Sequence, residues 1–421
     1  MGTWAATALV VSEVVGVGIL LTPATMMRSL GGIWAPLAMW VATGAMSAAG
    51  ALCYAELATR FPRAGGTYVF LREGFGRRCA FVYGWMAMLV MDPGITAALG
   101  IGAAQYLLAT VGVSTRYTTV VALAAIVACA LLVTRGLSVG ARVMAWTGGV
   151  KLAIVGVLVL AGLWRFIGGA PAAGPPGGAA AGPEALAASV IAAFFAFGGW
   201  WDLGRMSEEV ASPRRTMPKA LIGGVLLVAA IYIVVTATFV MAAPGADAQT
   251  NDAYVAAAGA ALFGTAAGRL LPGMVVVAVV GSLAAVLLGA PRTYAAMARD
   301  HVLPARLNWF DEARGRSPVG TVVQASLACV LVLLGSFDQI LGYFVPAAVF
   351  FLGLSAAALL KLERPSPSSD VFRTPVYPLP LIVFLALIAV MLALFIVGQP
   401  TQTSLGAAVV MLGLLVSHFL I

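Results

Sequence analysis

Apolar stretches of 18 or more residues recur along the whole chain, and short segments rich in glycine, proline and arginine separate them. Each stretch is long enough to cross the roughly 30 Å hydrocarbon core of a bilayer as a helix. The pattern therefore predicts an all-α polytopic membrane protein with twelve transmembrane helices. The predicted spans are Thr3–Ser29, Ile33–Arg60, Cys79–Val111, Tyr117–Thr134, Arg142–Arg165, Glu184–Val210, Pro218–Ala243, Gly268–Arg299, Pro318–Gly335, Phe337–Lys361, Pro378–Val397 and Ser404–Ile421.

The composition agrees with this pattern. Of the 421 residues, 62% are hydrophobic and 10% are charged, whereas roughly 25% of the residues in a soluble domain are charged. A soluble fold is therefore excluded. The four cysteines and two histidines are scattered, without the spacing of a disulfide framework or a zinc site. We expect no metal, no cofactor and no enzymatic activity, because no Ser/His/Asp or HExxH arrangement is present.

Lysine and arginine gather in alternate connections between the predicted spans. By the positive-inside rule, both termini are expected in the cytoplasm and the protein in the cytoplasmic (inner) membrane of the cell. The formal net charge of +8 then reflects topology and contact with anionic headgroups, and not binding to nucleic acid. The arginines of the two most basic connections, after spans 2 and 8, are Arg60, Arg63, Arg72, Arg77, Arg78, Arg299, Arg306, Arg314 and Arg316.

The chain divides into two halves of five spans each. Residues 168–183 form a linker rich in glycine, proline and alanine, which we expect outside the cell. It separates residues 1–167 (spans 1–5) from residues 184–361 (spans 6–10), and residues 362–421 add spans 11 and 12. An odd number of spans in each half turns the second half upside down, which is the inverted-repeat architecture of many secondary transporters.

Spans 1 and 6 are both interrupted, the first at Gly16-Val17-Gly18 and the second at Phe197-Gly198-Gly199-Trp200. Glycine also eases the packing of membrane helices, and a single interruption would favour that simpler explanation. Two interruptions in matching positions of the two halves favour a binding site.

Four motifs occur in a fixed order along the chain. They are Gly16 to Leu20 with Pro23; Tyr54 to Leu57 with Phe61 to Tyr68; Phe195 to Trp200 with Glu208, Glu209 and Pro213 to Ala220; and Arg292 with Ala296 to Asp300, Leu303 and Pro304. In this order and spacing they resemble the amino acid-polyamine-organocation superfamily, and most of all its bacterial amino acid permeases and L-type exchangers. The resemblance covers nearly the entire chain. It implies twelve helices, of which the first ten form a LeuT-like 5+5 inverted repeat.

A broken helix exposes unpaired amides at the start of one half and unpaired carbonyls at the end of the other. We predict that amides near Val17, Gly18 and Ile19 bind a substrate carboxylate, and that carbonyls near Val14, Val15 and Phe197 accept hydrogen bonds from its ammonium group. Phe197 and Trp200 would pack over the substrate, although both can equally be ordinary core, which is our expectation for Trp201. The predicted substrate-binding residues are Val14, Val15, Gly16, Val17, Gly18, Ile19, Phe197, Gly198, Gly199 and Trp200.

Lys151 lies inside span 5, where an unpaired ammonium group costs a few kcal/mol. The resemblance implies that Lys151 takes the place of a sodium ion and that its charge contacts spans 1 and 8. Lys151 is also a candidate for proton uptake and release, and the alternative is that it snorkels to the membrane surface. In span 8, Leu283 to Ala290 contains no hydroxyl, so Ser282 is the one candidate ligand there and sodium independence is predicted.

Three carboxylates lie within or beside the interruptions: Glu13, Asp92 and Asp202. Intramembrane carboxylates are functional candidates by default. Glu13 could contact a substrate ammonium group, hold a proton, or pair with Lys151 or an arginine. Asp92 and Asp202 are candidates for lining the site or for capping broken helix turns. Glu208 and Glu209, at the cytoplasmic end of span 6, are predicted to form an inner gate with Arg63, Arg214 or Arg299.

These features predict a sodium-independent secondary transporter that moves amino acids across the membrane by alternating access. Proton-coupled uptake is the first hypothesis, and obligatory amino acid exchange is the second. Transport of cationic amino acids or polyamines stays open because of the three carboxylates, and a non-transporting amino acid sensor is a remote alternative. The expected partners are an amino acid, a proton or counter-substrate, and the lipid bilayer.

Overall fold

The computed structural model describes residues 2–15, 18–30, 34–63, 65–135, 137–168, 182–242, 251–303, 317–366 and 369–420. Within these ranges the chain forms helices and connecting turns, with no strand. Eleven helical segments are long and apolar enough to cross a membrane, and Pro318–Leu334, the predicted ninth span, is a shorter apolar helix. The all-helical polytopic fold is confirmed at this level, while the count of twelve spans stays a prediction.

The helices of the first half begin with the three pieces of span 1. In chain order they are α1 (Thr3–Val14), α2 (Gly18–Leu21), α3 (Pro23–Leu30), α4 (Trp34–Arg60), α5 (Thr67–Phe75), α6 (Arg77–Met86), the π-helical turn η1 (Ala87–Met91), α7 (Asp92–Val111), the 3₁₀ turn η2 (Thr115–Tyr117), α8 (Thr118–Val133) and α9 (Leu137–Ile167).

The helices of the second half begin with the two pieces of span 6. They are α10 (Pro183–Phe197), the 3₁₀ helix η3 (Trp200–Glu209), α11 (Pro213–Ala242), α12 (Asn251–Phe263), α13 (Thr265–Gly289), α14 (Pro291–Arg299), α15 (Pro318–Leu334), α16 (Phe337–Ala357), the 3₁₀ turn η6 (Ala358–Leu360), α17 (Leu379–Gly398) and α18 (Pro400–Leu420). Residues 169–181, most of the predicted linker, lie outside the described residues.

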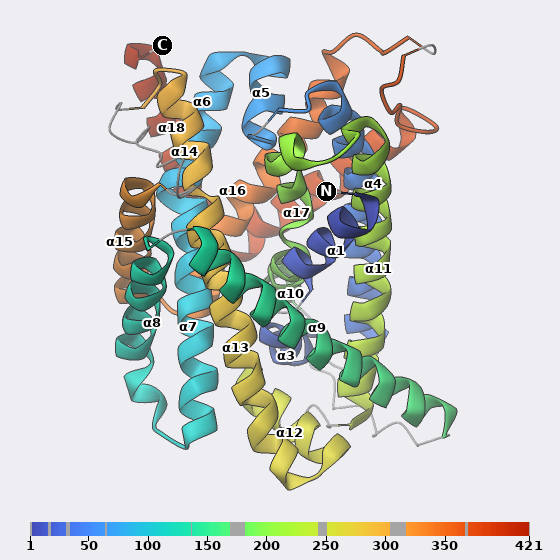
Figure 1. The fold of residues 1–421 in the computed structure, drawn as a ribbon, viewed down its shortest axis with the longest axis vertical. Coiled ribbons are helices and arrows are strands. Elements are labelled where there is room, and N and C mark those ends of the chain that lie inside the picture. Colours follow the sequence, from blue (N-terminus) through green and yellow to red (C-terminus); the bar gives the residue numbers. More distant parts are fainter. Residues whose placement is uncertain are drawn as a thin grey trace.

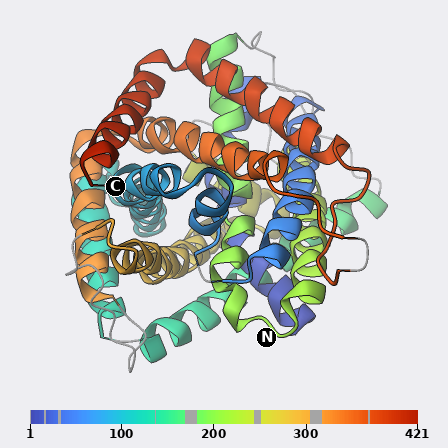
Figure 2. The same cartoon turned by 90° about the horizontal axis from the view of Figure 1, so that it is seen from above.

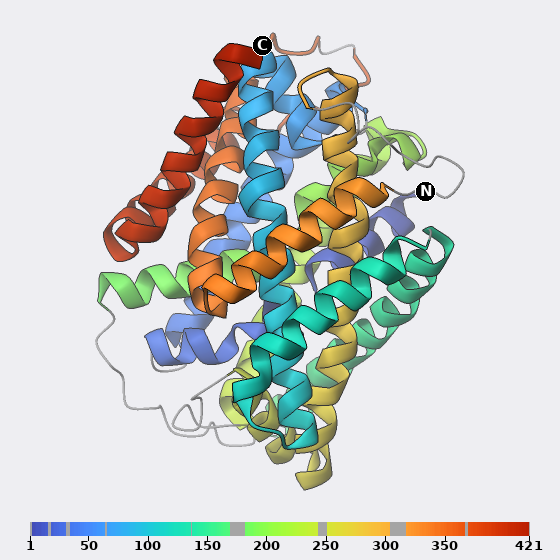
Figure 3. The same cartoon turned by 90° about the vertical axis from the view of Figure 1, so that its left-hand side faces the viewer.

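The long helices form one bundle around the broken spans (Figure 1). Helix α9 runs obliquely across it and contacts both α13 and α11 (Figure 1). Seen from above, the C-terminal helices α17 and α18 lie along the outside of the bundle (Figure 2). Both termini lie in the half of the bundle that carries α5, and α12 lies at the opposite end (Figure 3). Helix α5 lies in a basic connection, so the termini lie in the same half of the bundle as Arg72, and the cytoplasmic orientation of that half stays a prediction.

Two helices stand where the sequence pattern predicted only connections, α5 and α12. Helix α5 forms because four consecutive residues from Tyr68 to Leu71 are buried against the bundle. Its far side is held by Asp300, whose carboxylate accepts hydrogen bonds from the Tyr68 hydroxyl (2.7 Å) and from Arg72 (3.0 Å). Burial and this hydrogen bond to Asp300 both raise the pKa of Tyr68, so its hydroxyl stays a donor at neutral pH. The connection after span 2 is thereby fixed to the end of span 8.

A second connection is fixed by Glu56, whose side chain is fully buried near the end of α4. Its carboxylate pairs with Arg60 one turn later and lies 3.5 Å from Arg364. It also accepts a hydrogen bond from the backbone N–H of Thr374 at 2.7 Å. A buried carboxylate needs such partners because burial without them is costly. Glu56, part of the second sequence motif, thus ties the chain between α16 and α17 to span 2.

The predicted interruptions are present in both broken spans. Helix α1 ends at Val14, Val15 is extended (φ −73°, ψ 129°) and α2 begins at Gly18, while Gly16 and Val17 lie outside the described residues. In span 6, α10 ends at Phe197, and Gly199 takes a positive φ of 110° before η3 begins. Side chains other than glycine rarely adopt that conformation, so a glycine is required at position 199.

Gly18 provides the test of how closely the two broken spans approach. A Cβ atom at position 18 would lie 2.1 Å from the Ala196 Cα, which is backbone and cannot move aside. We expect Gly18→Ala to destabilise the protein by about 1–3 kcal/mol through overpacking, seen as a lower melting temperature in detergent. The control is Gly156→Ala in α9, where a Cβ has no atom within 4 Å. Equal melting temperatures for the two variants would contradict this packing.

Candidate substrate site at the two helix breaks

The two breaks lie directly against each other in the centre of the bundle. Gly18, at the start of α2, packs on the backbone of Ala196 near the end of α10. On the other side, a Cβ at Gly199 would be 3.4 Å from backbone and side-chain atoms of Glu13. The end of α10 therefore lies against the break of span 1, and the end of α1 lies against the break of span 6. The exposed backbone groups of both breaks face one small region.

Tyr232 of α11 joins the two breaks. Its hydroxyl lies 2.7 Å from the carbonyl oxygen of Val14 and 2.7 Å from that of Ala196. One hydroxyl has one proton, so the two carbonyls share a donor. Each carbonyl oxygen keeps a second lone pair, which leaves Val14 able to accept a further hydrogen bond. The side chain of Tyr232 is fully buried, so this contact is shielded from water.

Two further carbonyls at the breaks lack a backbone donor among the described residues. Within the described residues, no backbone N–H donates to the carbonyl of Val15 or of Phe197. Both belong to the set that the sequence predicts to bind an ammonium group. The predicted amide donors include Gly18 and Ile19 in the first turn of α2, where N–H groups lack helical partners. The breaks thus offer acceptors and donors side by side, which is the complement of a zwitterionic amino acid.

The aromatic residues of span 6 differ in what they contact. The Phe197 ring lies between Trp40 and Tyr232, with ring centres 5.9 and 5.1 Å away. Trp200 is 2% exposed and packs edge-on against Tyr54 of α4 at 5.1 Å. Phe197 and Trp200 therefore fill core positions in this conformation, and their contact with a substrate stays a prediction.

Trp201, which the sequence analysis expects in the core, is partly exposed. It stacks on Phe194 with a ring separation of 5.8 Å and lies beside Gly198. Its ring is therefore closer to the open part of the break than that of its neighbour.

Lys151 of α9 is buried, with 7% of its surface exposed. One turn earlier, Gly148 faces the Ser12 hydroxyl of α1, and Thr147 packs on Gly281 of α13. The turn that carries Lys151 thus lies between spans 1 and 8. Among the described residues, Glu13 is the charged group that interacts with Lys151 electrostatically. The two side chains, both within the described part of the chain, do not form an ion pair within 4 Å. Ser282 follows Gly281 in α13 and is partly buried.

The acidic residues Asp92 and Asp202 meet around an arginine that the sequence analysis did not select. Arg205 Nε lies 2.9 Å from Asp202 Oδ1, one turn along η3. Arg205 Nη2 approaches the Tyr83 hydroxyl at 3.5 Å, and Asp92 is within electrostatic reach of the guanidinium. An arginine and two carboxylates from spans 3 and 6 therefore form one charged group next to the breaks.

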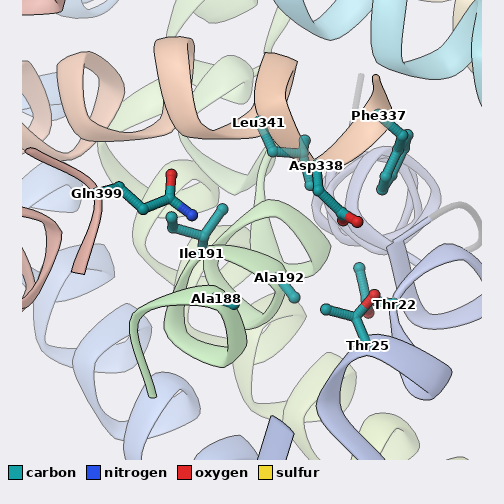
Figure 4. Close-up of a pocket in the computed structure, with 9 residues that line it drawn as sticks. All are labelled: Thr22, Thr25, Ala188, Ile191, Ala192, Phe337, Asp338, Leu341 and Gln399. Atoms are coloured by element: carbon teal, nitrogen blue, oxygen red, sulfur yellow. The ribbon is translucent and has the colours of Figure 1, made fainter. Parts of the chain in front are cut away.

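A small pocket lies on the other side of the breaks, between α3, α10 and α16 (Figure 4). Asp338 points across it toward Thr22 and Thr25 (Figure 4). The Thr22 hydroxyl in turn donates to the Gly18 carbonyl at 2.8 Å. The pocket measures about 20 Å³, room for about one water molecule. It is therefore too small to admit an amino acid.

The partly exposed charged groups near the breaks lie toward the end of the bundle that carries α5. The side chains of Asp202 and Arg205 are 32% and 17% exposed, and charged groups require water at an exposed surface in a membrane. Backbone atoms of Arg205 lie against Gly66, just before α5. Toward the opposite end, Ile19 and Thr22 are completely buried. Side chains beside the breaks are thus more exposed toward the basic end of the bundle than toward the other end.

The predicted inner gate is described only in part. The backbone of Glu208 and Glu209 ends η3, but their side chains lie outside the described residues. Of the predicted arginine partners, Arg63 lies 3.7 Å from Glu73, and Arg214 lies 3.8 Å from Asp370. The gate therefore stays a prediction.

A family model described as amino acid permease matches residues 1–416 of this chain. The chain belongs to the amino acid permease family. The serine/threonine exchanger SteT of Bacillus subtilis (strain 168) is 24% identical to it over 408 residues, which cover 96% of this chain and 91% of the exchanger. The b(0,+)-type amino acid transporter 1 of Homo sapiens is 25% identical over 440 residues, 100% of this chain and 87% of the transporter.

The cystine/glutamate transporter of Homo sapiens is 23% identical over 412 residues, which cover 96% of this chain and 82% of that protein. The superfamily predicted from the four motifs is thereby confirmed. The chain is an amino acid transporter with membrane-spanning helices. The prediction that it is not an enzyme is confirmed too, because the family and these relatives are transporters.

Tyr232 gives the sharpest test of this site in the permease. Tyr232→Phe removes the one hydroxyl that serves two buried carbonyls, and we expect a loss of about 1–3 kcal/mol of stability, together with weaker amino acid binding. The measurement is thermal unfolding in detergent with and without amino acid.

The control is Tyr254→Phe in α12, because the Tyr254 hydroxyl is also buried but has no hydrogen-bond partner among the described residues. Its removal is expected to leave the melting temperature unchanged or to raise it. If Tyr232→Phe were equally harmless, the shared hydrogen bond would not hold the breaks together.

Proposed function

We propose that this permease is a sodium-independent secondary transporter that binds its amino acid at the breaks of spans 1 and 6. The observation that carries the proposal is the meeting of the two breaks, where the carbonyls of Val15 and Phe197 have no backbone donor among the described residues and the amides of Gly18 and Ile19 begin α2. An amino acid presents a carboxylate and an ammonium group at a fixed separation, and it can engage both sets at once.

The architecture that supports this function is an inverted repeat. Residues 1–167 and 184–361 are the proposed halves, joined by an external linker at residues 168–183 and followed by spans 11 and 12. With both termini in the cytoplasm, the end of the bundle that carries α5 faces the cell interior. The described conformation would then be open inward, with its outer pocket closed around Asp338.

Lys151 is proposed to supply the positive charge that a sodium ion would bring. Its support is the burial of the side chain on the turn of α9 that lies between α1 and α13, with Glu13 as its charged neighbour. Sodium requires several oxygen ligands, and Ser282 supplies the one hydroxyl of span 8 from Ser282 to Ala290.

Replacement of Lys151 tests this role. In proteoliposomes we expect Lys151→Ala to lower amino acid transport at least tenfold, because Glu13 would be left without its counter-charge. The matched control is Lys219→Ala, which removes the same charge from an exposed position near the start of α11. Wild-type transport by Lys151→Ala, with or without added sodium, would rule out the proposed cation site.

The mode of transport is proposed to be proton-coupled uptake, with obligatory exchange as the second candidate. Exchange is favoured by SteT, whose name describes a serine/threonine exchanger. A thermal-shift screen over the amino acids identifies ligands first, because binding raises the melting temperature by mass action.

The best ligand is then tested in proteoliposomes that contain no amino acid. Under the first mode, an inward pH gradient drives accumulation of the labelled ligand. Accumulation only into liposomes preloaded with amino acid would reject proton-coupled uptake in favour of exchange.

A further inference from the structure

The charged groups around the breaks form a closed set within the described part of the chain. Glu13 interacts with Lys151, Asp202 and Arg205, while Asp92 interacts with Arg205 and Asp202. Two of the three carboxylates have a cation of their own, since Glu13 faces Lys151 and Asp202 holds Arg205 at 2.9 Å. When all five groups are ionised, one negative charge is therefore unmatched, and it falls on Asp92.

The hydrogen bonds of Asp92 come from neutral groups. The Tyr294 hydroxyl donates to its carboxylate at 2.8 Å. The Gln324 side-chain amide lies 3.4 Å from its backbone carbonyl and 2.9 Å from Thr96 Oγ1. Gln324 is fully buried, yet its Oε1 has no hydrogen-bond partner among the described residues. An acceptor buried without a donor is costly, so this region lacks a donor for the Gln324 side-chain oxygen.

The local helix geometry marks the same place. The π-helical turn η1 (Ala87–Met91) ends directly before Asp92. Such turns insert one extra residue into a helix and occur frequently at functional sites. The unmatched carboxylate therefore coincides with a distortion of span 3, at the point where Pro93 removes a backbone N–H from the helix.

Arg205 links this buried carboxylate to the open part of the site. Its guanidinium pairs with Asp202, which is 32% exposed, and is within electrostatic reach of Asp92, which is 6% exposed. Tyr83 and Tyr294 are the neutral titratable neighbours of this group. One arginine thus interacts with two carboxylates, one partly exposed and one buried.

We propose that one positive charge travels with every substrate, as a proton on Asp92 when the amino acid is neutral and as the substrate's own side chain when it is cationic. This inference rests on the proposed transport function at the breaks. It assigns two substrate classes, neutral and cationic amino acids, to the same site.

The two cases give the charged set the same total charge. With a neutral amino acid, the proton neutralises Asp92 and provides the O–H donor that the region around Gln324 lacks. With a cationic amino acid, the ammonium or guanidinium group pairs with the exposed Asp202. Arg205 then turns to Asp92, and no proton is needed.

The test uses proteoliposomes loaded with unlabelled leucine and a pH-sensitive dye, at equal pH inside and outside. External labelled leucine should enter in exchange with no change of internal pH. External labelled arginine should enter while leucine leaves with its proton, so that the interior loses about one proton for each arginine. Exchange works as an assay whether the permease is a symporter or an obligatory exchanger. Serine and lysine serve as the second neutral and cationic probes.

The possible results separate this inference from the proposed transport function on which it rests. Arginine entry without loss of internal protons would overturn the further inference, as would exchange of leucine and serine without any entry of arginine or lysine. Both results leave the proposed amino acid transport intact. Failure to exchange any of the four amino acids would instead overturn the transport function and this inference with it.

Asp92→Asn removes the unmatched charge and tests its location. We expect the ratio of arginine to leucine exchange to fall on the order of tenfold, and the remaining leucine exchange to lose its dependence on pH. The control is Asp370→Asn, which removes an 85% exposed carboxylate near Arg214 and should keep the wild-type ratio. An unchanged ratio in Asp92→Asn would contradict the assignment, and the proton measurement on the wild-type protein decides it independently of any variant.

Discussion

A helix that stops inside a membrane exposes carbonyl and amide groups that lipid cannot satisfy. In this protein two helices stop at the same place, and the Tyr232 hydroxyl serves a carbonyl from each of them at 2.7 Å. That shared donor fixes the end of α1 beside the end of α10, while the carbonyls of Val15 and Phe197 receive no backbone N–H among the described residues. The site thus exists because the chain satisfies some of the exposed backbone groups and leaves others unsatisfied.

The charges follow from the same arrangement. An ionised side chain in a membrane needs water or a counter-charge, and water reaches this bundle at Asp202 and Arg205. The buried Lys151 has Glu13 within electrostatic reach instead. Asp92 shares Arg205 with Asp202, and the group that donates a hydrogen bond to its carboxylate, Tyr294, is neutral. A position of this kind is stable only if a proton or another cation is available to it.

The sequence predicted those features that depend on residues close together in the chain. The spans follow from runs of apolar residues, the breaks from glycine pairs, and Lys151 from a single charge in an apolar helix. The role of Tyr232 could not be predicted, because a tyrosine in an apolar helix has no distinctive pattern and its partners lie 36 and 218 positions away.

The contact between Asp92 and Tyr294 of α14 could not be predicted either, because the two residues are far apart in the sequence. Helix α5 was missed because its formation depends on burial of Tyr68 to Leu71 by distant parts of the chain. The burial of Trp200 and the exposure of Trp201 depend on the 3₁₀ geometry of η3, since three residues per turn orient neighbours differently from an α-helix.

The helices around the site fall into two groups by their contacts. Helices α1, α4, α10 and α11 pack on one another around the breaks, and α7, α8, α13 and α15 pack on one another beside them. Glu13 and Arg205 belong to the first group. Asp92 lies on α7 of the second group, and its neighbours Tyr83 and Tyr294 lie on α6 and α14. Lys151 lies on α9, which contacts both groups. The charged set therefore lies across the boundary between the groups. A proton or cation that binds at this boundary stabilises one arrangement of the two helix groups more than the other. Such a difference is what allows a ligand to shift a conformational equilibrium. In the proposed transporter, the coupling of charge to movement would arise at this boundary, and the backbone clamp at the breaks would only have to hold the amino acid.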